Sequence, residues 1–199
     1  MRIFVFLVVL LTGCSSSSTV KYNHYLLPDL VTPTDVGEHY PVMLVETDMA
    51  DYLNQSGLVF RSSNSEIIYA RHHLWAHGIS QQIAHKIINS LRAKQSHTWP
   101  IGYTPGVKLD ETPRLRVHFL RFNGTHTGHA ELTGEWLLTN AKGRIIKSKH
   151  FAIKVTLKAS GYTALVEALS KGIELLTEEI AAELINTKEK TGYTSKALD

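Results

Sequence analysis

The residue with the clearest capacity for covalent chemistry is Cys14, the only cysteine among the 199 residues. A secreted domain with one cysteine cannot form an internal disulfide. Cys14 directly follows Thr12-Gly13, and these follow Arg2 and the unbroken apolar run Ile3–Leu11. A positive start, a short apolar core and small residues before a cut are typical of a secretory signal, and the run is far shorter than the ~20 residues that span a bilayer. The pattern predicts a signal peptide over residues 1–13.

The stretch Leu11-Thr12-Gly13-Cys14 resembles the lipobox of bacterial lipoproteins, in which small residues let a membrane peptidase reach the bond before the cysteine. The resemblance implies a diacylglycerol thioether on Cys14 and an acyl chain such as palmitate on the new N-terminus. Each buried methylene contributes about 0.8 kcal/mol, and several chains together give lasting attachment. The alternative is an ordinary thiol at the edge of a signal peptide.

The segment after the cut, residues 14–19, is composed of small polar residues and reads as a short tether. At ~3.5 Å per extended residue it reaches less than about 20 Å, so the domain must lie close to its membrane. Ser15, where enterobacterial lipoproteins kept at the inner membrane carry Asp, resembles outer-membrane cargo. We therefore expect a lipid-anchored protein at the periplasmic face of the outer membrane.

Histidine and glutamate offer the other candidates for chemistry. His73 and His77 have the i, i+4 spacing of a zinc site, with His85 as a third ligand, but Gly78 disfavours a helix there, so we expect no metal. Glu131 and Glu135 share one face of a predicted strand, where a solvated pair is commoner than an acid–base pair. No GxSxG, Walker or GxGxxG motif is present, so we expect no cofactor and no enzyme.

Four large side chains could contact a partner or serve packing. Trp75 lies between a hairpin and a helix, Trp136 lies inside a strand, and Tyr69 and Arg61 lie on paired strands. Tryptophan is enriched at binding hot spots, but core packing and cross-strand pairing are the commoner roles.

The bulk composition is that of one ordinary globular domain, with 43% apolar and 20% charged residues. The formal net charge of +3 falls to +2 once Arg2 is removed, and no Lys/Arg block stands out. A nucleic-acid role therefore has no support.

The elements that must position these side chains follow from periodicity. Apolar stripes predict a helix that starts near Gly78 or Ser80, with Ile79, Ile83, Ile87 and Leu91 buried and Gln82 and Lys86 mostly outside the stripe. A second stripe, Leu165 to Leu184, predicts a helix over residues 162–185. Strands are predicted over residues 20–27, 41–47, 57–61, 66–70, 114–122, 129–139 and 145–157, with a short helical turn at 49–55 and a hairpin loop at 62–65.

Connections and ends complete the expected layout. Asn123-Gly124 and residues 140–143 are predicted turns, and residues 99–106, with two prolines and two glycines, a loop. In the strand before Asn123 we expect the side chains of Leu115, Val117, Phe119 and Arg121 to lie on one face. The simplest packing is an α+β fold of two layers, a mostly antiparallel sheet with two main helices on one face. The domain should cover residues 20–186, followed by a loose tail over 187–199.

At this point the chain resembles the PqiC/YmbA family, the ABC-type transport auxiliary lipoproteins that are partners of MCE-type lipid transport systems. The resemblance is carried, in order along the chain, by the residues Leu11–Cys14, Tyr25–Leu27, Gly57–Arg61, Tyr69, Leu74–Ala76, Phe122–Gly124, Gly134–Trp136 and Gly161–Val166. The departures are Gly78, where family members often carry Pro, and the histidines around His72.

The resemblance implies a non-catalytic docking subunit of an intermembrane lipid transport complex that supports envelope integrity. Its partner would be an MCE-type membrane protein whose tube shields lipid tails, because each exposed methylene costs about 0.8 kcal/mol. It also allows a homo-oligomeric ring around that tube. Two alternatives from other classes stay open: a carrier that holds a lipid inside its own fold, and a structural or glycan-binding envelope lipoprotein.

Overall fold

The computed structural model describes residues 20–28, 40–94, 97–106, 108 and 111–191. The predicted signal peptide, Cys14 and the tether lie outside these residues. The described elements are, in chain order, β1 (Asn23–Tyr25), β2 (Val42–Met49), the 3-10 turn η2 (Asp51–Leu53), β3 (Gly57–Arg61), β4 (Ile67–Trp75), α1 (Ile79–Lys94), β5 (Trp99–Ile101), β6 (Arg114–Thr125), β7 (His129–Thr139), β8 (Ile145–Thr156) and α2 (Tyr162–Thr191).

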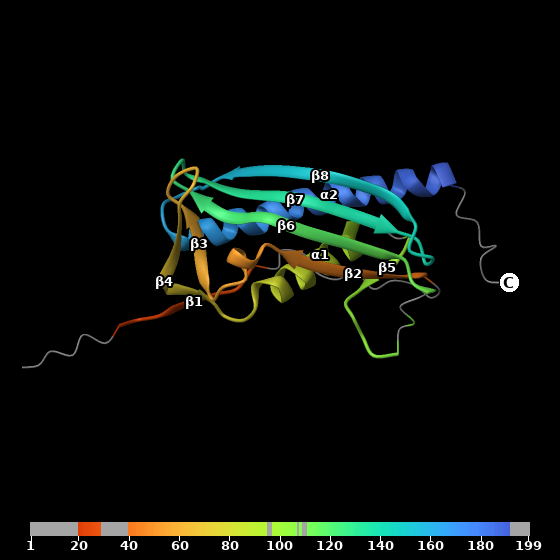
Figure 1. Cartoon of the computed structure of the whole chain (residues 1–199), viewed down its shortest axis with the longest axis horizontal. Helices are drawn as coiled ribbons and strands as arrows, with labels where there is room; N and C mark the ends of the chain where they lie inside the picture. Colours follow the sequence, from red (N-terminus) through yellow and green to blue (C-terminus); the bar gives the residue numbers. More distant parts are fainter. Residues whose placement is uncertain (1–19, 29–39, 95–96, 107, 109–110, 192–199) are drawn as a thin grey trace, which may run out of the picture.

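Strand β6 is the centre of the sheet (Figure 1). One edge of β6 pairs with β7, which pairs in turn with β8, and both ladders are long and antiparallel. The other edge is shared: β2 pairs in parallel with the first half of β6, and β3 pairs in parallel with its last residues. Between β2 and β3 the turn η2 leaves the sheet, and the Tyr52 hydroxyl donates to the Leu120 carbonyl over 2.7 Å, which satisfies an acceptor in the gap.

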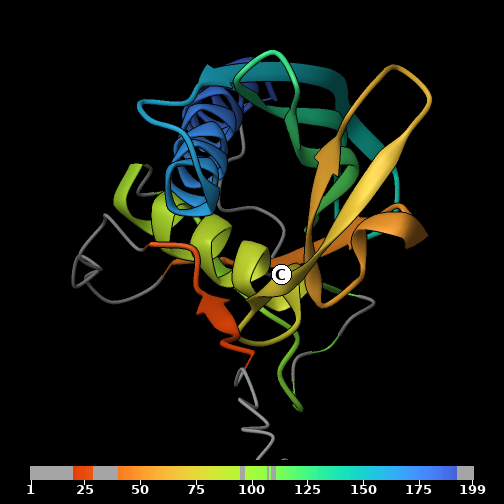
Figure 2. The same cartoon turned by 90° about the vertical axis from the view of Figure 1, so that its left-hand side faces the viewer.

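Both main helices lie on the same face of the sheet, which curves around them (Figure 2). Their predicted stripes are confirmed: the side chains of Ile83, Ile87 and Leu91 are 0% exposed, and so are Ile173 and Leu176. They pack on the inward residues of the strands, among which Phe119 meets Phe122 and Phe151 edge to face. The predicted two-layer α+β class is therefore confirmed, although the shorter pairings β1–β4, β2–β5, β2–β6 and β3–β6 are parallel.

A β-bulge in β6 corrects the predicted face of Arg121. The register shifts between Phe119 and Arg121, so Leu120 is an extra residue and the alternation inverts after it. Phe122 then occupies the buried face, at 3% exposure, and Arg121 turns outward. Gly134 lies opposite Phe119 beside the bulge, where a Cβ atom would stand 1.9 Å from the His118 carbonyl oxygen.

The predicted turn at Asn123-Gly124 is wrong, because both residues continue β6 opposite Glu131 and Ala130. The chain instead turns after Thr125, where the Gly128 amide donates to the Thr125 carbonyl and Gly128 adopts φ 76°. The strand alternation of β6 and β7 outweighs the local preference of Asn-Gly for a turn.

The predicted loop over residues 99–106 is also partly wrong, because Trp99–Ile101 form strand β5 on the edge of the sheet beside β2. Proline is compatible with an edge strand, since its missing N–H faces away from the ladder. Arg92 of α1 fixes this strand: its guanidinium lies 4.1 Å from the centroid of the Trp99 ring, and its Nε donates to the Pro100 carbonyl. Burial at this contact lowers the pKa of Arg92.

The ends of several elements differ from the sequence prediction. Strand β4 continues to Trp75, five residues beyond the end of the predicted strand 66–70. Strand β1 is shorter than residues 20–27, because the chain leaves β4 after Tyr25 and inserts toward the helices. Helix α1 begins at Ile79, and the Gly78 carbonyl accepts from the Gln82 amide, so the start at Gly78 is the correct alternative. Helix α2 continues to Thr191, into the segment expected to be a loose tail. Residues 192–199 lie outside the described chain.

Candidate functional site

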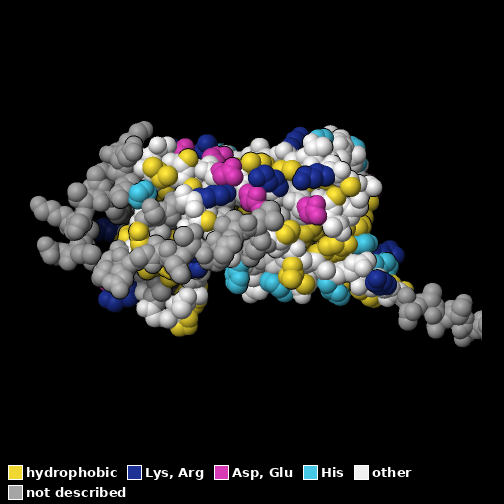
Figure 3. All heavy atoms as spheres, turned by 180° about the vertical axis from the view of Figure 1, so that it is seen from behind, with side chains coloured by type: hydrophobic (Ala, Val, Ile, Leu, Met, Phe, Trp, Pro, Cys, Tyr) yellow, Lys and Arg dark blue, Asp and Glu magenta, His cyan; other side chains and the backbone are white. Residues whose placement is uncertain are grey.

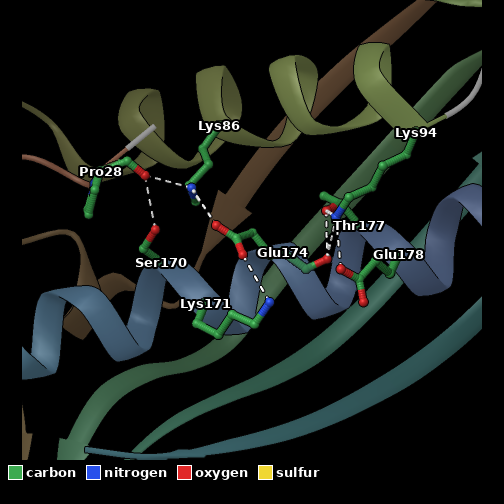
Figure 4. Close-up of polar contacts among 8 residues, drawn as sticks. All are labelled: Pro28, Lys86, Lys94, Ser170, Lys171, Glu174, Thr177 and Glu178. Carbon is green, nitrogen blue, oxygen red and sulfur yellow. Dashed lines mark hydrogen bonds and ion pairs between the residues drawn. The ribbon is translucent and has the colours of Figure 1, made fainter. Parts of the chain in front are cut away.

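The N-terminal segment is fastened to both helices at the end of the domain where the described chain begins (Figure 4). The Leu27 amide donates to Oε1 of Gln82 on α1 over 2.9 Å. The Pro28 carbonyl accepts from Nζ of Lys86 on α1 over 2.7 Å and from Oγ of Ser170 on α2 over 3.0 Å. This segment follows Cys14 by about a dozen residues, so these contacts join the helical layer to the part of the described chain nearest the predicted lipid site.

Lys86 is the central residue of this attachment, which we call the tether clasp (Gln82, Lys86, Ser170 and Glu174). Its side chain is 1% exposed and also lies 3.5 Å from Oε1 of Glu174, which pairs at its other oxygen with Lys171. A buried ammonium is tolerated only when it is paired and hydrogen-bonded. Further along, Lys94 Nζ donates to the Glu174 carbonyl and to Thr177, so polar contacts continue between the helices.

We predict that Lys86→Ala lowers the free energy of unfolding by about 3 kcal/mol, because it deletes one partner of a buried pair and leaves a cavity. Lys171→Ala is the matched control, since Lys171 contacts the same carboxylate from a half-exposed position and should change stability by less than about 1 kcal/mol. Urea denaturation followed by circular dichroism measures both. Equal losses in the two variants would contradict a special role for Lys86.

Aromatic contacts fix β1 beside the clasp. The Tyr25 hydroxyl hydrogen-bonds Nδ1 of His73 over 2.8 Å, and the His73 ring stacks on Tyr162 at the start of α2, with ring centroids 4.0 Å apart. His73 thus serves packing. His72 and His77 are exposed, and within the described residues no group of three or more His, Cys, Asp or Glu could hold a metal ion.

The four candidate side chains fall into two places. Trp75 and Trp136 belong to the hydrophobic core, at 6% and 1% exposure, and so present no free surface. Tyr69, 42% exposed, and Arg61, half-exposed, lie instead on the outer face of the sheet, away from the helices.

Arg61 and Tyr69 lie near Tyr52 and Arg121, and we call these four residues the outer-face patch. Burial raises the pKa of Tyr52, while the charges of Arg61 and Arg121 act on it in the opposite sense. Arg121 extends toward Glu131, whose carboxylate lies 3.4 Å from Arg121 Nη1 and 3.2 Å from Lys154 Nζ.

The carboxylates of Glu131 and Glu135 on β7 therefore lie in different environments. Glu131 is nearly buried between two cations, whereas Glu135 is exposed and 3.8 Å from His150. They do not form a convergent acid–base pair.

A cleft of about 560 Å³, open to solvent, is lined by the start of β6 and the end of β7. Figure 1 shows that this end of the sheet lies away from β1 and β4. The wall of the cleft consists of Glu46, Arg114, Arg116, Leu137, Thr139, Asn140, Ala141, Lys142, Gly143 and Ile145. Arg116 is committed to Glu46, with Nη2 and Oε2 3.0 Å apart. The mixed polar lining does not suit an alkyl chain.

Sequence reasoning missed the clasp, because Gln82 and Lys86 were expected outside the apolar stripe of α1. They are 6% and 1% exposed and face α2 and the N-terminal segment. A signal was present: Gln82 and Lys86 on one helix, and Ser170 and Glu174 on the other, are each spaced i, i+4 along the border of a stripe.

Comparison with known proteins places the chain in a family. The family described as "ABC-type transport auxiliary lipoprotein component" matches residues 25–181. The chain is 31% identical over 163 residues to the intermembrane transport lipoprotein PqiC of Escherichia coli K12, a match that covers 80% of this chain and 84% of that protein. The protein of the same name from Shigella flexneri matches equally.

Solved structures share the fold. A crystal structure of an uncharacterized protein has a TM-score of 0.71 at 22% identity and covers 82% of this chain and 99% of its own. A Xanthomonas campestris protein has a TM-score of 0.64 at 13% identity, with 88% and 97% covered.

Within the described residues no helix is long and apolar enough to cross a membrane. The match over residues 25–181 extends from β1 through the clasp into α2 and confirms the resemblance seen in the sequence. The chain belongs to the family of ABC-type transport auxiliary lipoprotein components.

Proposed function

We propose that this protein is a non-catalytic docking subunit of an MCE-type intermembrane lipid transport complex and that it supports envelope integrity. In this proposal acyl lipid on Cys14 holds it at the periplasmic face of the outer membrane, and it needs no other cofactor. Support comes from the similarity to a protein named intermembrane transport lipoprotein PqiC.

The observation that carries the proposal is the tether clasp. Lys86 and Ser170 converge on the Pro28 carbonyl from two helices, so the chain at Leu27 and Pro28 is part of the folded domain. A lipid on Cys14 would then restrain the whole domain and its binding surfaces, as a docking subunit requires.

The outer-face patch is the surface we propose for the partner. Tyrosine and arginine are enriched at binding hot spots, and the patch combines two of each on the face that the helices leave free.

The carrier alternative requires an apolar cavity between the sheet and the helices. In the described residues that space is filled by side chains such as Phe119, Leu132 and Ile173, each 0% exposed. In our proposal the protein therefore supports the route along which lipid moves and does not hold a lipid inside its own fold.

Affinity purification tests the proposal. Tagged full-length protein, pulled down from detergent-solubilised envelope, should recover a membrane protein with MCE repeats. Tyr69→Ala with Arg61→Ala should reduce recovery at least about fivefold, since hot-spot residues each contribute more than 1 kcal/mol. The matched control is Arg144→Ala with Lys142→Ala at the exposed turn before β8, which should leave recovery unchanged.

Recovery of no MCE protein in several detergents would contradict the docking role. If the patch variant recovered as much MCE protein as the parent does, the contact would lie on another surface. Assembly of several copies into a ring around the partner's tube is a further part of the hypothesis, and the mass of the purified protein in solution tests it.

A further inference from the structure

Charge is distributed unevenly over the described domain. The elements β1, β3, β4 and α1 contain no aspartate or glutamate, although they contain the cations Arg61, Arg71, Lys86, Arg92 and Lys94 and four histidines. The acidic side chains lie mainly on β2, β7 and α2. In the view of Figure 3, histidines line the lower edge of the molecule toward the end where the N-terminal segment leaves, and no acidic side chain is visible there.

At this end β1 is the edge strand, and exposed side chains lie on both of its sides. By strand alternation Tyr22, His24 and His72 share one side, whereas Arg71 lies on the other. The register pairs His24 with Leu74, and Tyr22 meets His72 edge to face, with ring centroids 5.3 Å apart. Tyr22 and Leu26 are 53% and 58% exposed, large fractions for such side chains. We call the exposed residues Lys21, Tyr22, His24, Leu26, Arg71 and His72 the anchor-end surface.

The length of the preceding chain places this surface near the bilayer. Lys21 lies seven positions after Cys14, and at ~3.5 Å per extended residue this span reaches at most about 25 Å. Because β1 is hydrogen-bonded to β4 and the clasp holds Leu27 and Pro28, the surface cannot swing away independently of the domain.

We propose that the anchor-end surface rests on the anionic phospholipid headgroups of the membrane to which the protein is attached. Lys21 and Arg71 supply positive charge against that surface, where each cation strengthens binding severalfold. Tyrosine and histidine have an apolar body and a polar tip, which suits the headgroup region, and Leu26 offers an aliphatic contact below it. Lipid anchors commonly need such a second signal for stable binding.

This inference rests on the proposed lipid anchor, but its test does not use the lipid. The mature chain, residues 14–199 with Cys14→Ser, is sedimented with phosphatidylcholine vesicles that contain or lack phosphatidylglycerol. We expect binding to the anionic vesicles alone, weakened by added salt because exposed charges are screened.

Two charge reversals provide the comparison. Lys21→Glu with Arg71→Glu should weaken vesicle binding about tenfold or more. Lys142→Glu with Arg144→Glu makes the same change in net charge at the far end of the sheet and should bind as the parent does. Thermal unfolding by circular dichroism shows that each variant remains folded; if the first pair unfolds, Tyr22→Ser with Leu26→Ser replaces it, with the same expected loss.

Equal loss in both pairs would overturn the proposal, because binding would then follow net charge alone. Absence of binding to anionic vesicles would overturn it as well. Neither result bears on recovery of an MCE protein or on the mass of the lipidated product, so failure of this inference and failure of the proposed function are distinguishable.

Discussion

Gly134→Ala should abolish the folded state. A Cβ at residue 134 would stand 1.9 Å from the carbonyl oxygen of His118 and 2.9 Å from Cζ of Phe151. The first of these atoms belongs to the backbone of β6, so relief requires separation of the β6–β7 ladder next to its bulge. We expect a loss of more than about 5 kcal/mol, which is the whole stability of a domain at the lower end of the usual range of about 5–15 kcal/mol. Far-ultraviolet circular dichroism and the soluble yield measure it.

Gly78→Ala is the control, because its Cβ would meet only Oε1 of Gln81 at 3.7 Å, an ordinary contact. This variant should differ from the parent by less than about 1 kcal/mol. A folded Gly134→Ala protein of parental stability would show that the close approach of β6 and β7 at the bulge is not required.

Cys14→Ser should move nearly all of the protein from the membrane to the soluble fraction. The thiol is the proposed site of lipid attachment, and a retained leader is far shorter than a bilayer span. Because Cys14 precedes the described domain by several residues, the variant should keep the parental melting temperature. Fractionation after a carbonate wash measures release, and Ser15→Ala is the neighbouring control.

Persistence of the Cys14→Ser protein in the washed membrane fraction would contradict the anchor. Intact-mass analysis of the native product gives an independent answer. An unmodified thiol with the leader still attached would exclude lipidation, whereas a mass increased by acyl groups on residues 14–199 would support it.

The helices were predictable because one stripe of side chains decides both their period and their buried face. Ile83, Ile87 and Leu91 repeat every four residues and are 0% exposed, and no long-range contact is needed to infer this. The strands β7 and β8 and the turn between them were predictable for the same reason, since alternation and the residues Asn140–Gly143 are local features.

The face of Arg121 was not predictable, because the bulge at Leu120 depends on the facing strand. Only the absence of a side chain at Gly134 lets β7 approach β6 there, and these residues lie 14 apart in the chain. Asn123-Gly124 was misread for a related reason: a local turn preference competes with the ladder to Glu131, which the sequence does not display.

The parallel pairings and the clasp are likewise long-range. Pro28 and Ser170 are separated by 142 residues, and nothing in either segment alone indicates that they meet. Of the four candidate side chains, Tyr69 and Arg61 do share the outer face, but Tyr52 comes to them only because η2 leaves the sheet between β2 and β3.

The length of helix α2 determines how far the domain extends from its anchor end. It starts at Tyr162, against His73 at the anchor end, and its 30 residues rise about 45 Å at 1.5 Å each. If the anchor-end surface lies on the bilayer as we propose, the far end of α2 is held tens of ångströms from the lipid, measured along the helix axis. Shortening α2 by whole turns would therefore change the span that a partner must bridge.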